Sequence, residues 1–532
     1  MTRIKETKQS HAETRSSQRP ASAAPAPQRE PSEADDLPLG WASAPLGEIA
    51  EINPRHAKGL DEAMPVTFVP MAGLSESKPD FQFTEERPLS EVRKGFTHFA
   101  EGDVLFAKIT PCMENGKGAV ARGLRNKLGC GTTELHVIRP LGGISPDYLY
   151  RFLAQRSVRR AAKENFTGTA GQARVPTGFL QELALPIPPL AEQRRIVAKL
   201  EELLGQVDAC QRRLAKIPAL LKRFRQSVLA AACSGRLTAD WREENGKQSV
   251  LSLLNEIRER REEVWAKQRT AKGLTVKPTD YPEPAKPSDE FEFDVPETWE
   301  PCSMDALTSA ITSGSRDWRQ YYRDDGTGTF IMAQNVRPLR FDRSYRLAVA
   351  PPQNDRDRAR SEVFKDDLLV TIVGANTGDS CRVPEELREH YVCQSVALLR
   401  PVSPETSRFL ELYLNSSGHG LAEYKKWIYG EGRPHLSFDH LREMLVCLPS
   451  LREQQEIVRR VEGLFALADR IEARLAAAQR QVDTLTPSLL ARAFAGKLVP
   501  QDPADEPADE LLERIEIQRK DTHESRRTRK RL

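Results

Sequence analysis

One stretch of 48 residues occurs twice in the chain, and it decides the fold. Residues 190–237 read LAEQRRIVAKLEELLGQVDACQRRLAKIPALLKRFRQSVLAAACSGRL, and residues 451–498 read LREQQEIVRRVEGLFALADRIEARLAAAQRQVDTLTPSLLARAFAGKL. The copies align without a gap at a separation of 261 positions, and about a third of the aligned residues are identical. Solenoid repeats have much shorter periods, of about 20–50 residues, so the chain is a tandem of two related halves.

Both copies place apolar residues at alternating steps of four and three, the period of a coiled coil. This period continues for more than four heptads, which indicates a long helix packed on a partner helix, and the natural partner of each copy is the other. The alternative is two amphipathic helices, each packed on its own domain. Pro218 and Pro487 predict a bend or break in each helix. The predicted seam residues are Ile196, Leu200, Leu203, Val207, Leu214, Leu221, Ile457, Val461, Leu464, Ile471, Leu475 and Val482.

Length and composition limit the class of protein. A chain of 532 residues suits two to four domains, and a formal net charge of +3 requires any nucleic-acid contact to come from local clusters. The eight cysteines show no metal-ligand spacing and resemble free thiols of a reducing compartment. No apolar run is long enough to span a membrane, and no signal peptide is recognisable, so we expect a cytoplasmic protein.

The texture of the chain predicts an α+β fold with two tandem globular domains, separated by two long helices that form an antiparallel coiled coil with pseudo-twofold symmetry. The globular stretches contain short Val, Ile, Leu and Phe runs between Gly, Pro and Asn, whereas the N-terminus has too little apolar content to fold. The predicted segments are a disordered extension (1–36), a first domain (37–187), a first long helix (188–237), a linker with a helix (238–290), a second domain (291–446), a second long helix (447–500), and a C-terminal helix with a basic tail (501–532).

The duplication extends into the globular domains. Trp41 corresponds to Trp299, Asp103-Val104-Leu105 to Asp367-Leu368-Leu369, and Arg139-Pro140 to Arg400-Pro401, while the loops differ. Domains that are alike in framework and unlike in loops suggest one scaffold presenting two different recognition surfaces.

Known catalytic and metal-binding motifs are missing from the sequence. There is no P-loop, no HExxH, and no His or Cys cluster of metal-ligand spacing. The pair Glu423-x-Lys425 is expected by chance in a chain this charged, and neither Pro188-Pro189 nor Pro351-Pro352 fits the motif of amino-methyltransferases. We therefore predict no catalytic residue and no metal site in this chain.

Binding is the class of function that remains once catalysis is excluded. The loops contain polar side chains of the kinds that contact base edges and phosphates in protein–DNA complexes. For each such residue a solvated surface or turn position is an equal alternative. A basic C-terminal run, Arg526 to Arg531, can also bind phosphate without sequence preference. The candidate DNA-binding residues are Lys108, Thr110, Asn115, Lys117, Gln172, Arg174, Arg316, Trp318, Arg319, Asn335, Asn376, Thr377, Arg433 and His435.

The repeated ends of the two long helices resemble those of a known family. Each begins with Leu-x-Glu-Gln-x-x-Ile-Val, at residues 190–197 and 451–458, and each ends with Gly-Arg/Lys-Leu, at 235–237 and 496–498. Together with Gly-Lys-Leu-Val-Pro-Gln-Asp-Pro at 496–503, this pattern is similar to the DNA-specificity subunit of Type I restriction-modification systems.

The resemblance implies that each globular domain is a target-recognition domain reading one half of a split, asymmetric double-stranded DNA sequence. It also implies that the chain itself binds no cofactor. Two modification subunits would carry S-adenosylmethionine and methylate adenine at N6, and restriction subunits would use ATP and magnesium. Two alternatives remain: the specificity component of a related two-subunit system, and a coiled-coil scaffold that binds only proteins.

Overall fold

The computed structural model describes residues 37–531, apart from 169–171, 247–248, 316, 354–355 and 431. The chain divides into two compact units: unit 1 contains the chain up to Ala209 and from Val482 onward, and unit 2 contains Cys210–Gln481. The extension predicted at 1–36 lies outside the described residues. None of the helices in the described part of the chain is long and apolar enough to cross a membrane.

Unit 1 contains two four-stranded sheets and a two-stranded ribbon. Its strands are β1 (Ala42–Pro45), β2 (Ala50–Ile52), β3 (Pro65–Val69), β4 (Glu85–Pro88), β5 (Thr97–Ala100), β6 (Val104–Ala107), β7 (Gly118–Val120), β8 (Leu128–Gly131), β9 (Leu135–Pro140) and β10 (Ala184–Ile187). The sheet orders are β2-β9-β6-β7 and β4-β3-β8-β5, and β1 pairs with β10. Only β3 and β8 are parallel among these pairs. The apolar runs of the sequence become strands such as β6, which is buried along its whole length.

Unit 2 repeats this topology. Its strands are β11 (Glu300–Ser303), β12 (Thr308–Ser313), β13 (Gly328–Ile331), β14 (Val336–Arg337), β15 (Arg340–Phe341), β16 (Leu347–Val349), β17 (Leu368–Thr371), β18 (Ser380–Arg382), β19 (His390–Val392), β20 (Val396–Pro401) and β21 (Leu445–Leu448). The order β12-β20-β17-β18 matches the first sheet of unit 1, and β16-β13-β19 matches the second without a counterpart of β5, with β13 and β19 as the parallel pair. Strand β11 pairs with β21 as β1 does with β10, and β14 and β15 form a separate two-stranded pair. The predicted α+β class is confirmed.

Short helices pack around these sheets. In unit 1 they are α1 (Leu46–Ile49), α2 (Leu89–Val92), α3 (Pro146–Leu153), α4 (Arg156–Glu164) and α5 (Thr177–Glu182), followed at the C-terminal end by the longer α16 (Ala508–Arg531). In unit 2 they are α8 (Ala239–Asn245), α9 (Leu251–Ala271), α10 (Met304–Leu307), α11 (Arg356–Ser361), α12 (Ser407–Leu414), α13 (Gly420–Trp427) and α14 (Phe438–Glu443). The basic run predicted as a tail continues the backbone of α16.

The repeated stretches form the long helices α6 (Leu190–Leu214), α7 (Ile217–Cys233) and α15 (Leu451–Phe494). The predicted break is confirmed at Pro218, which lies in the first turn of α7, where its missing N–H is not needed. The second proline behaves differently, because α15 continues through Pro487 without interruption.

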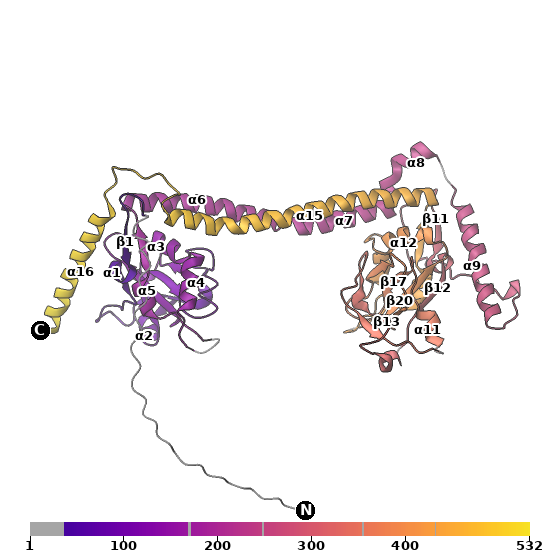
Figure 1. The fold of residues 1–532 in the computed structure, drawn as a ribbon, viewed down its shortest axis with the longest axis horizontal. Coiled ribbons are helices and arrows are strands. Elements are labelled where there is room, and N and C mark those ends of the chain that lie inside the picture. Colours follow the sequence, from indigo (N-terminus) through magenta and orange to yellow (C-terminus); the bar gives the residue numbers. More distant parts are fainter. Residues whose placement is uncertain are drawn as a thin grey trace, which may run out of the picture. The chain divides into compact units, whose positions relative to one another are not determined.

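The long helices pack against each other in each unit. In unit 1, Ile196 and Leu200 near the start of α6 share a core with Ala493 and Phe494 at the end of α15. In unit 2, α7 near its end contributes Val228 and its neighbours to a core that includes residues near the start of α15. The helices therefore run antiparallel, as predicted (Figure 1).

A buried ion pair explains the repeated framework positions. Arg139 donates two hydrogen bonds to Asp103, of 2.8 and 2.7 Å, and Arg400 does the same to Asp367, at 2.9 and 2.8 Å. Each aspartate is almost fully buried and also accepts a backbone N–H from its own loop. Since removing one partner would leave a buried charge unpaired, both residues are constrained in both units.

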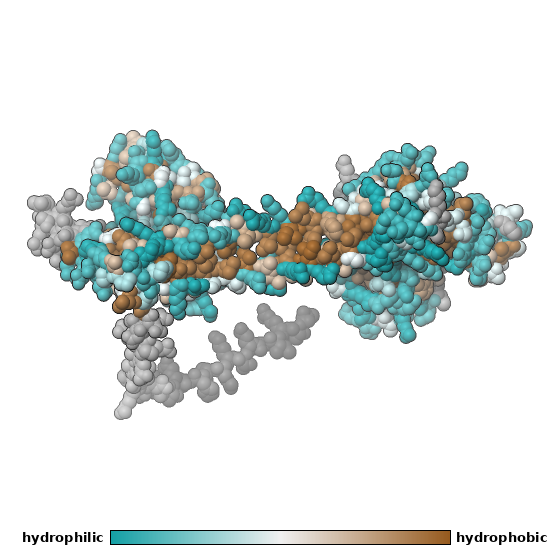
Figure 2. Space-filling view, turned by 90° about the horizontal axis from the view of Figure 1, so that it is seen from above, coloured by the Kyte–Doolittle hydropathy of each residue, from teal (hydrophilic) through white to brown (hydrophobic). Residues whose placement is uncertain are grey.

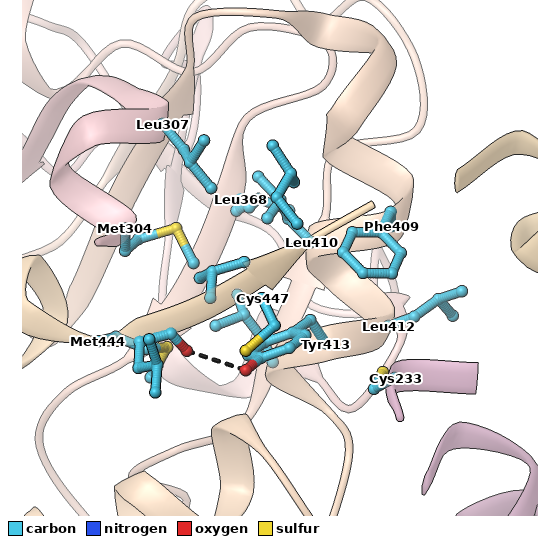
Figure 3. Packing of buried hydrophobic residues seen from close by; sticks show 14 of the residues in the cluster. Cys233, Met304, Leu307, Leu368, Phe409, Leu410, Leu412, Tyr413, Met444 and Cys447 are labelled. Carbon is cyan, nitrogen blue, oxygen red and sulfur yellow. Dashed lines mark hydrogen bonds between the residues drawn. The ribbon is translucent and has the colours of Figure 1, made fainter. Parts of the chain in front are cut away.

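The core of unit 2 lies where α7, α12 and β21 meet (Figure 3). Tyr413 of α12 is completely buried and donates its hydroxyl to the backbone oxygen of Leu445 at 2.9 Å. Tyr148 of α3 does the same in unit 1, with the oxygen of Pro186 at 2.8 Å. A buried tyrosine hydroxyl needs such a partner, so these bonds fix α3 and α12 against the last strand of each unit.

Candidate nucleic-acid interface

The two polar loops predicted in unit 1 lie side by side. The amide of Thr110 donates to the oxygen of Ala173 at 3.1 Å, and the amide of Val175 donates to the oxygen of Lys108 at 2.9 Å. An isolated antiparallel bridge joins Ile109 to Arg174. We call residues 108–117, 167–168 and 172–175 the paired loops of unit 1.

Unit 2 has the same arrangement at the corresponding place. The amide of Leu436 donates to the oxygen of Ile372 at 2.9 Å, the amide of Gly374 donates to the oxygen of Pro434 at 3.0 Å, and Val373 bridges to His435. Residues 372–379, 429–430 and 432–436 are therefore the paired loops of unit 2. The backbone contacts at the junction are the same in the two units, whereas the loop lengths and the side chains differ.

An ion pair fixes the most prominent side chain of the first pair of loops. Arg174 donates Nε–H and Nη2–H to the carboxylate of Glu134, at 2.8 and 2.9 Å, and Nη1–H to the oxygen of Gln172 at 2.9 Å. The guanidinium lowers the pKa of Glu134, and the carboxylate raises that of Arg174. The Arg174 side chain nevertheless remains 40% exposed.

Three other candidates of unit 1 make contacts within the protein. The hydroxyl of Thr110 donates to Glu114 at 2.5 Å, and this bond lowers the pKa of the glutamate. Asn115 donates to Glu76 at 3.2 Å, and the ammonium of Lys117 donates to the oxygen of Met71 at 3.1 Å.

A basic cavity of about 440 Å³ adjoins these loops. Its lining residues, none of them acidic, are Asn53, Pro54, Arg55, Arg93, Lys94, Gly95, Phe96, Thr97, His98, Lys108 and Leu135. Arg93 pairs with Glu62 at 3.4 Å, while among the described residues Arg55, Lys94 and Lys108 form no ion pair. The sequence alone pointed only to Lys108, because Arg55, the adjacent Arg93 and Lys94, and Lys108 lie in three separate segments that only the packing of the fold brings together.

In the paired loops of unit 2, Thr377 stabilises the junction by donating its hydroxyl to the oxygens of Gly374 and Pro434, at 2.7 and 3.1 Å. The ring of His435 stacks on Tyr429, with centroids 5.9 Å apart. Arg433 is exposed and Asn376 is half-buried on the same loops. These side chains are the polar surface that the junction presents.

Two candidates of unit 2 were assigned wrongly to the surface. Trp318 is only 1% exposed and packs against Phe330 and Tyr391, with ring centroids 5.7 and 5.2 Å away, so it belongs to the core. Its charged sequence neighbours had favoured a position on a DNA-binding loop. Asn335 is 3% exposed, and its amide bonds the backbone of three residues, Met332, Asp342 and Tyr345, so no group is left for a base. Arg319 is exposed, and Arg316 lies outside the described residues.

The fold also brings together His56, His98 and Cys130, whose potential ligand atoms lie within 4.8 Å of one another. Each imidazole Nε2 donates to a backbone oxygen, of Phe99 and Arg93 respectively. The Nδ1 atom of His98 already accepts the amide of His56 at 3.3 Å, and the two rings stack with an interplanar angle of 21°. Three of the four imidazole nitrogens therefore already have partners within the protein, which leaves few ligand atoms for a metal ion.

The predicted seam residues fall into three groups. One predicted seam residue, Ile471, is exposed, at 37%. The half-buried residues are Leu203, Leu214, Leu464 and Val482. The buried residues are Ile196, Leu200, Val207, Leu221, Ile457, Val461 and Leu475.

Apolar side chains are nevertheless present on the surface over the long helices (Figure 2). Leu220, Leu467 and Ile471 are among the exposed large apolar residues of these helices.

Comparison with known proteins identifies a family model that matches more than half of the chain. It is the model of the Type I restriction modification DNA specificity domain, and it matches residues 38–219 and 357–478. The first stretch contains the paired loops of unit 1, and the second contains those of unit 2.

Curated relatives match this chain, two of them over most of its length. The specificity subunit of the Type I restriction enzyme EcoEI from Escherichia coli is 26% identical over 510 residues, covering 86% of this chain and 83% of the relative. The StySPI specificity subunit from Salmonella potsdam is 27% identical and covers 91% and 96%. The EcoAI specificity subunit from Escherichia coli is 41% identical over 174 residues, covering 32% and 29%.

Two solved structures share the fold, each aligning with 87% of this chain at 19% identity. One is a chain from a study of complex assembly and conformational transition of the type I R-M system, of which 99% is covered with a TM-score of 0.58. The other is the HsdS subunit from Thermoanaerobacter tengcongensis, of which 98% is covered with a TM-score of 0.56.

Proposed function

Because the chain belongs to the Type I restriction-modification DNA specificity family, and is thus the non-catalytic specificity subunit of such a complex, we propose that its two units read the two halves of a split DNA sequence. The observation that carries this proposal is the repeated junction of paired loops. Equivalent backbone bonds join the loops in both units, as with Val175 to Lys108 and Leu436 to Ile372. Two similar frames are suited to presenting two sets of base-reading side chains.

The half-sites should differ, because the side chains on the two frames differ. Unit 1 presents Arg174 held by Glu134, whereas unit 2 presents His435 stacked on Tyr429, with Arg433 beside them. Arginine and histidine match different patterns of donors and acceptors in the major groove. The recognised sequence is therefore asymmetric as well as split.

The basic cavity supports contact with the DNA backbone. Arg55, Lys94 and Lys108 place cationic groups beside the paired loops of unit 1, and no acidic residue lines the cavity. Phosphate contacts position a protein on the duplex, while base contacts select the sequence. In this arrangement a phosphate beside the half-site would bind in the cavity.

The long helices supply surfaces for partner subunits. Leu220, Leu467 and Ile471 are exposed apolar residues on them, and exposed apolar patches mark protein interaction sites. In the assembly that we propose, two modification subunits carry S-adenosylmethionine and methylate adenine at N6, and restriction subunits use ATP and magnesium.

Helix length provides a spacer between the half-sites in this proposal. Helix α15 has 44 residues, which corresponds to about 66 Å at 1.5 Å per residue. Its start contributes Ile457 to the core of unit 2, and its end contributes Phe494 to the core of unit 1. The number of unread base pairs would then depend on the length of this helix.

The test is single-molecule sequencing of the host genome with and without this gene, scored for modified adenines. We expect N6-methyladenine to disappear from one split, asymmetric motif with a constant gap. Replacing Arg433 by Ala should then alter methylation with respect to one half of that motif only. Methylation that is the same with and without the gene in an active system would contradict the proposed function.

A further inference from the structure

Arg174 keeps part of its hydrogen-bonding capacity unused. An arginine side chain has five N–H donors, and three of those of Arg174 bond Glu134 and Gln172. Within the described part of the chain, one N–H on each of the two terminal nitrogens therefore has no partner. Because the side chain is 40% exposed, this pair of donors can be reached from outside the protein.

Glu134 holds the guanidinium in place. The carboxylate binds it through two bonds, and Arg174 lowers the pKa of Glu134 by more than burial raises it, so Glu134 stays ionised. The backbone oxygen of Glu134 accepts the amide of Lys108 at 3.0 Å, so the carboxylate is itself attached to the paired loops. An arginine fixed in this way loses little rotamer freedom on binding, which favours affinity and geometric selectivity.

Two neighbouring donors in one plane match a guanine. In the major groove only guanine presents two adjacent acceptors, O6 and N7, whereas adenine presents an acceptor beside a donor. A phosphate could also accept both donors, but the cations of the adjacent cavity already provide for phosphate.

The equivalent position in unit 2 lacks this device. His435 makes the bridge to Val373 that Arg174 makes to Ile109. The backbone oxygen that accepts the amide of Ile372 belongs to Ser395, where unit 1 has Glu134. Among the described residues, the arginine–carboxylate clamp at this position is therefore found in unit 1 and not in unit 2.

We propose that Arg174 reads a guanine in the half-site bound by unit 1, and that Glu134 is the residue that positions it. This inference rests on the proposed function, because it requires that the paired loops enter a DNA groove. It adds the identity of one base and the residue responsible for selecting it.

The test compares Arg174→Lys and Glu134→Gln with the wild type in the complete modification complex. Binding is measured on duplexes carrying each of the four bases at every position of the unit 1 half-site. Arg174→Lys keeps the charge but loses the planar pair of donors, so affinity for the cognate site should fall by about 5- to 150-fold. The variant should discriminate less between bases at one G·C pair only, and as well as the wild type at every other position. Glu134→Gln should weaken discrimination at the same pair.

The matched control is Arg160→Lys with Glu164→Gln, an exposed ion pair of 3.1 Å on α4 of the same unit, which should leave base preference unchanged. The half-site of unit 2 serves as an internal control. Equal weakening on all sequences, with a smaller salt dependence, would make Arg174 a phosphate contact and overturn the inference. The inference would also be overturned if both variants discriminated between bases as the wild type does at every position. The same holds if circular dichroism showed that Arg174→Lys disrupts the fold of unit 1. Failure of the proposed function is distinguishable, because the wild-type complex would then show no preference for any split sequence.

Discussion

Two equivalent glutamates at the starts of the long helices should respond very differently to the same substitution. Glu192 accepts the indole N–H of Trp41 at 3.1 Å, and Glu453 accepts that of Trp299 at the same distance. Both carboxylates are almost completely buried. The repeated Trp and Glu positions of the sequence thus form the same contact in each unit.

Their other partners differ. Glu453 also accepts the hydroxyl of Thr238 at 2.8 Å and forms a hydrogen-bonded ion pair with Arg242, which is mostly buried. Among the described residues Glu192 forms no ion pair, since the nearby Arg195 pairs with Asp505 at 2.6 Å. Burial raises the pKa of Glu192, so its charged form is disfavoured.

The substitution Glu453→Gln should therefore destabilise unit 2 by about 2–3 kcal/mol, because it leaves the Arg242 charge without its carboxylate and points an amide N–H₂ toward one of three donors. Glu192→Gln preserves an acceptor for Trp41 and removes a poorly solvated acid, so we expect a cost below about 1 kcal/mol. The predicted difference between the variants is about 2 kcal/mol.

Hydrogen–deuterium exchange of the full chain can measure both, by comparing amides at the start of α6 with those at the start of α15. Each variant should affect only its own helix end. Equal losses of protection in the two variants would refute the reasoning, because the outcome would then depend on burial alone and not on the Arg242 ion pair. In the background of Arg242→Met, the cost of Glu453→Gln should fall toward that of Glu192→Gln.

Three further predictions follow from other parts of the chain. Burial raises the pKa of Glu423 to about 8, above its ordinary value of 4.5, so the stability of unit 2 should decline as pH rises from 4.5 to about 8. Glu423→Gln should flatten this decline in denaturant titrations. If the free energy of unfolding of the variant fell with pH as steeply as that of the wild type, Glu423 would not be its cause. Replacing Arg55 and Lys94 together by Gln should weaken binding to all sequences and reduce the slope of log affinity against log salt by about 1.8, whereas Arg160→Gln should not change it. Removing one heptad from α7 and the matching heptad from α15 shortens each helix by about 10 Å. The gap in the methylated motif should then be about three base pairs shorter, with both half-sites unchanged. A gap of unchanged length would exclude the helices as the spacer.

The sequence by itself was enough to establish the architecture. The heptad pattern and helix ends depend on residues three and four positions apart, which are already neighbours on a helix surface, so the long helices and the break at Pro218 could be read from residues 190–237 alone. The repeat at 451–498 then supplied the partner, and the matching Trp41 and Trp299 showed that the domains are duplicated too.

Only the tertiary structure decided what each candidate residue does. Arg174 meets Glu134 across 40 positions, and Trp41 meets Glu192 across 151, through strand pairings and packing that no local pattern encodes. Trp318 looked like a surface residue among its charged neighbours, yet it packs in the core, while Arg55 and Lys94 became part of a basic cavity without any basic run in the sequence. Helical contacts are local in the chain, whereas loop surfaces are formed by segments that come together only when the sheets assemble.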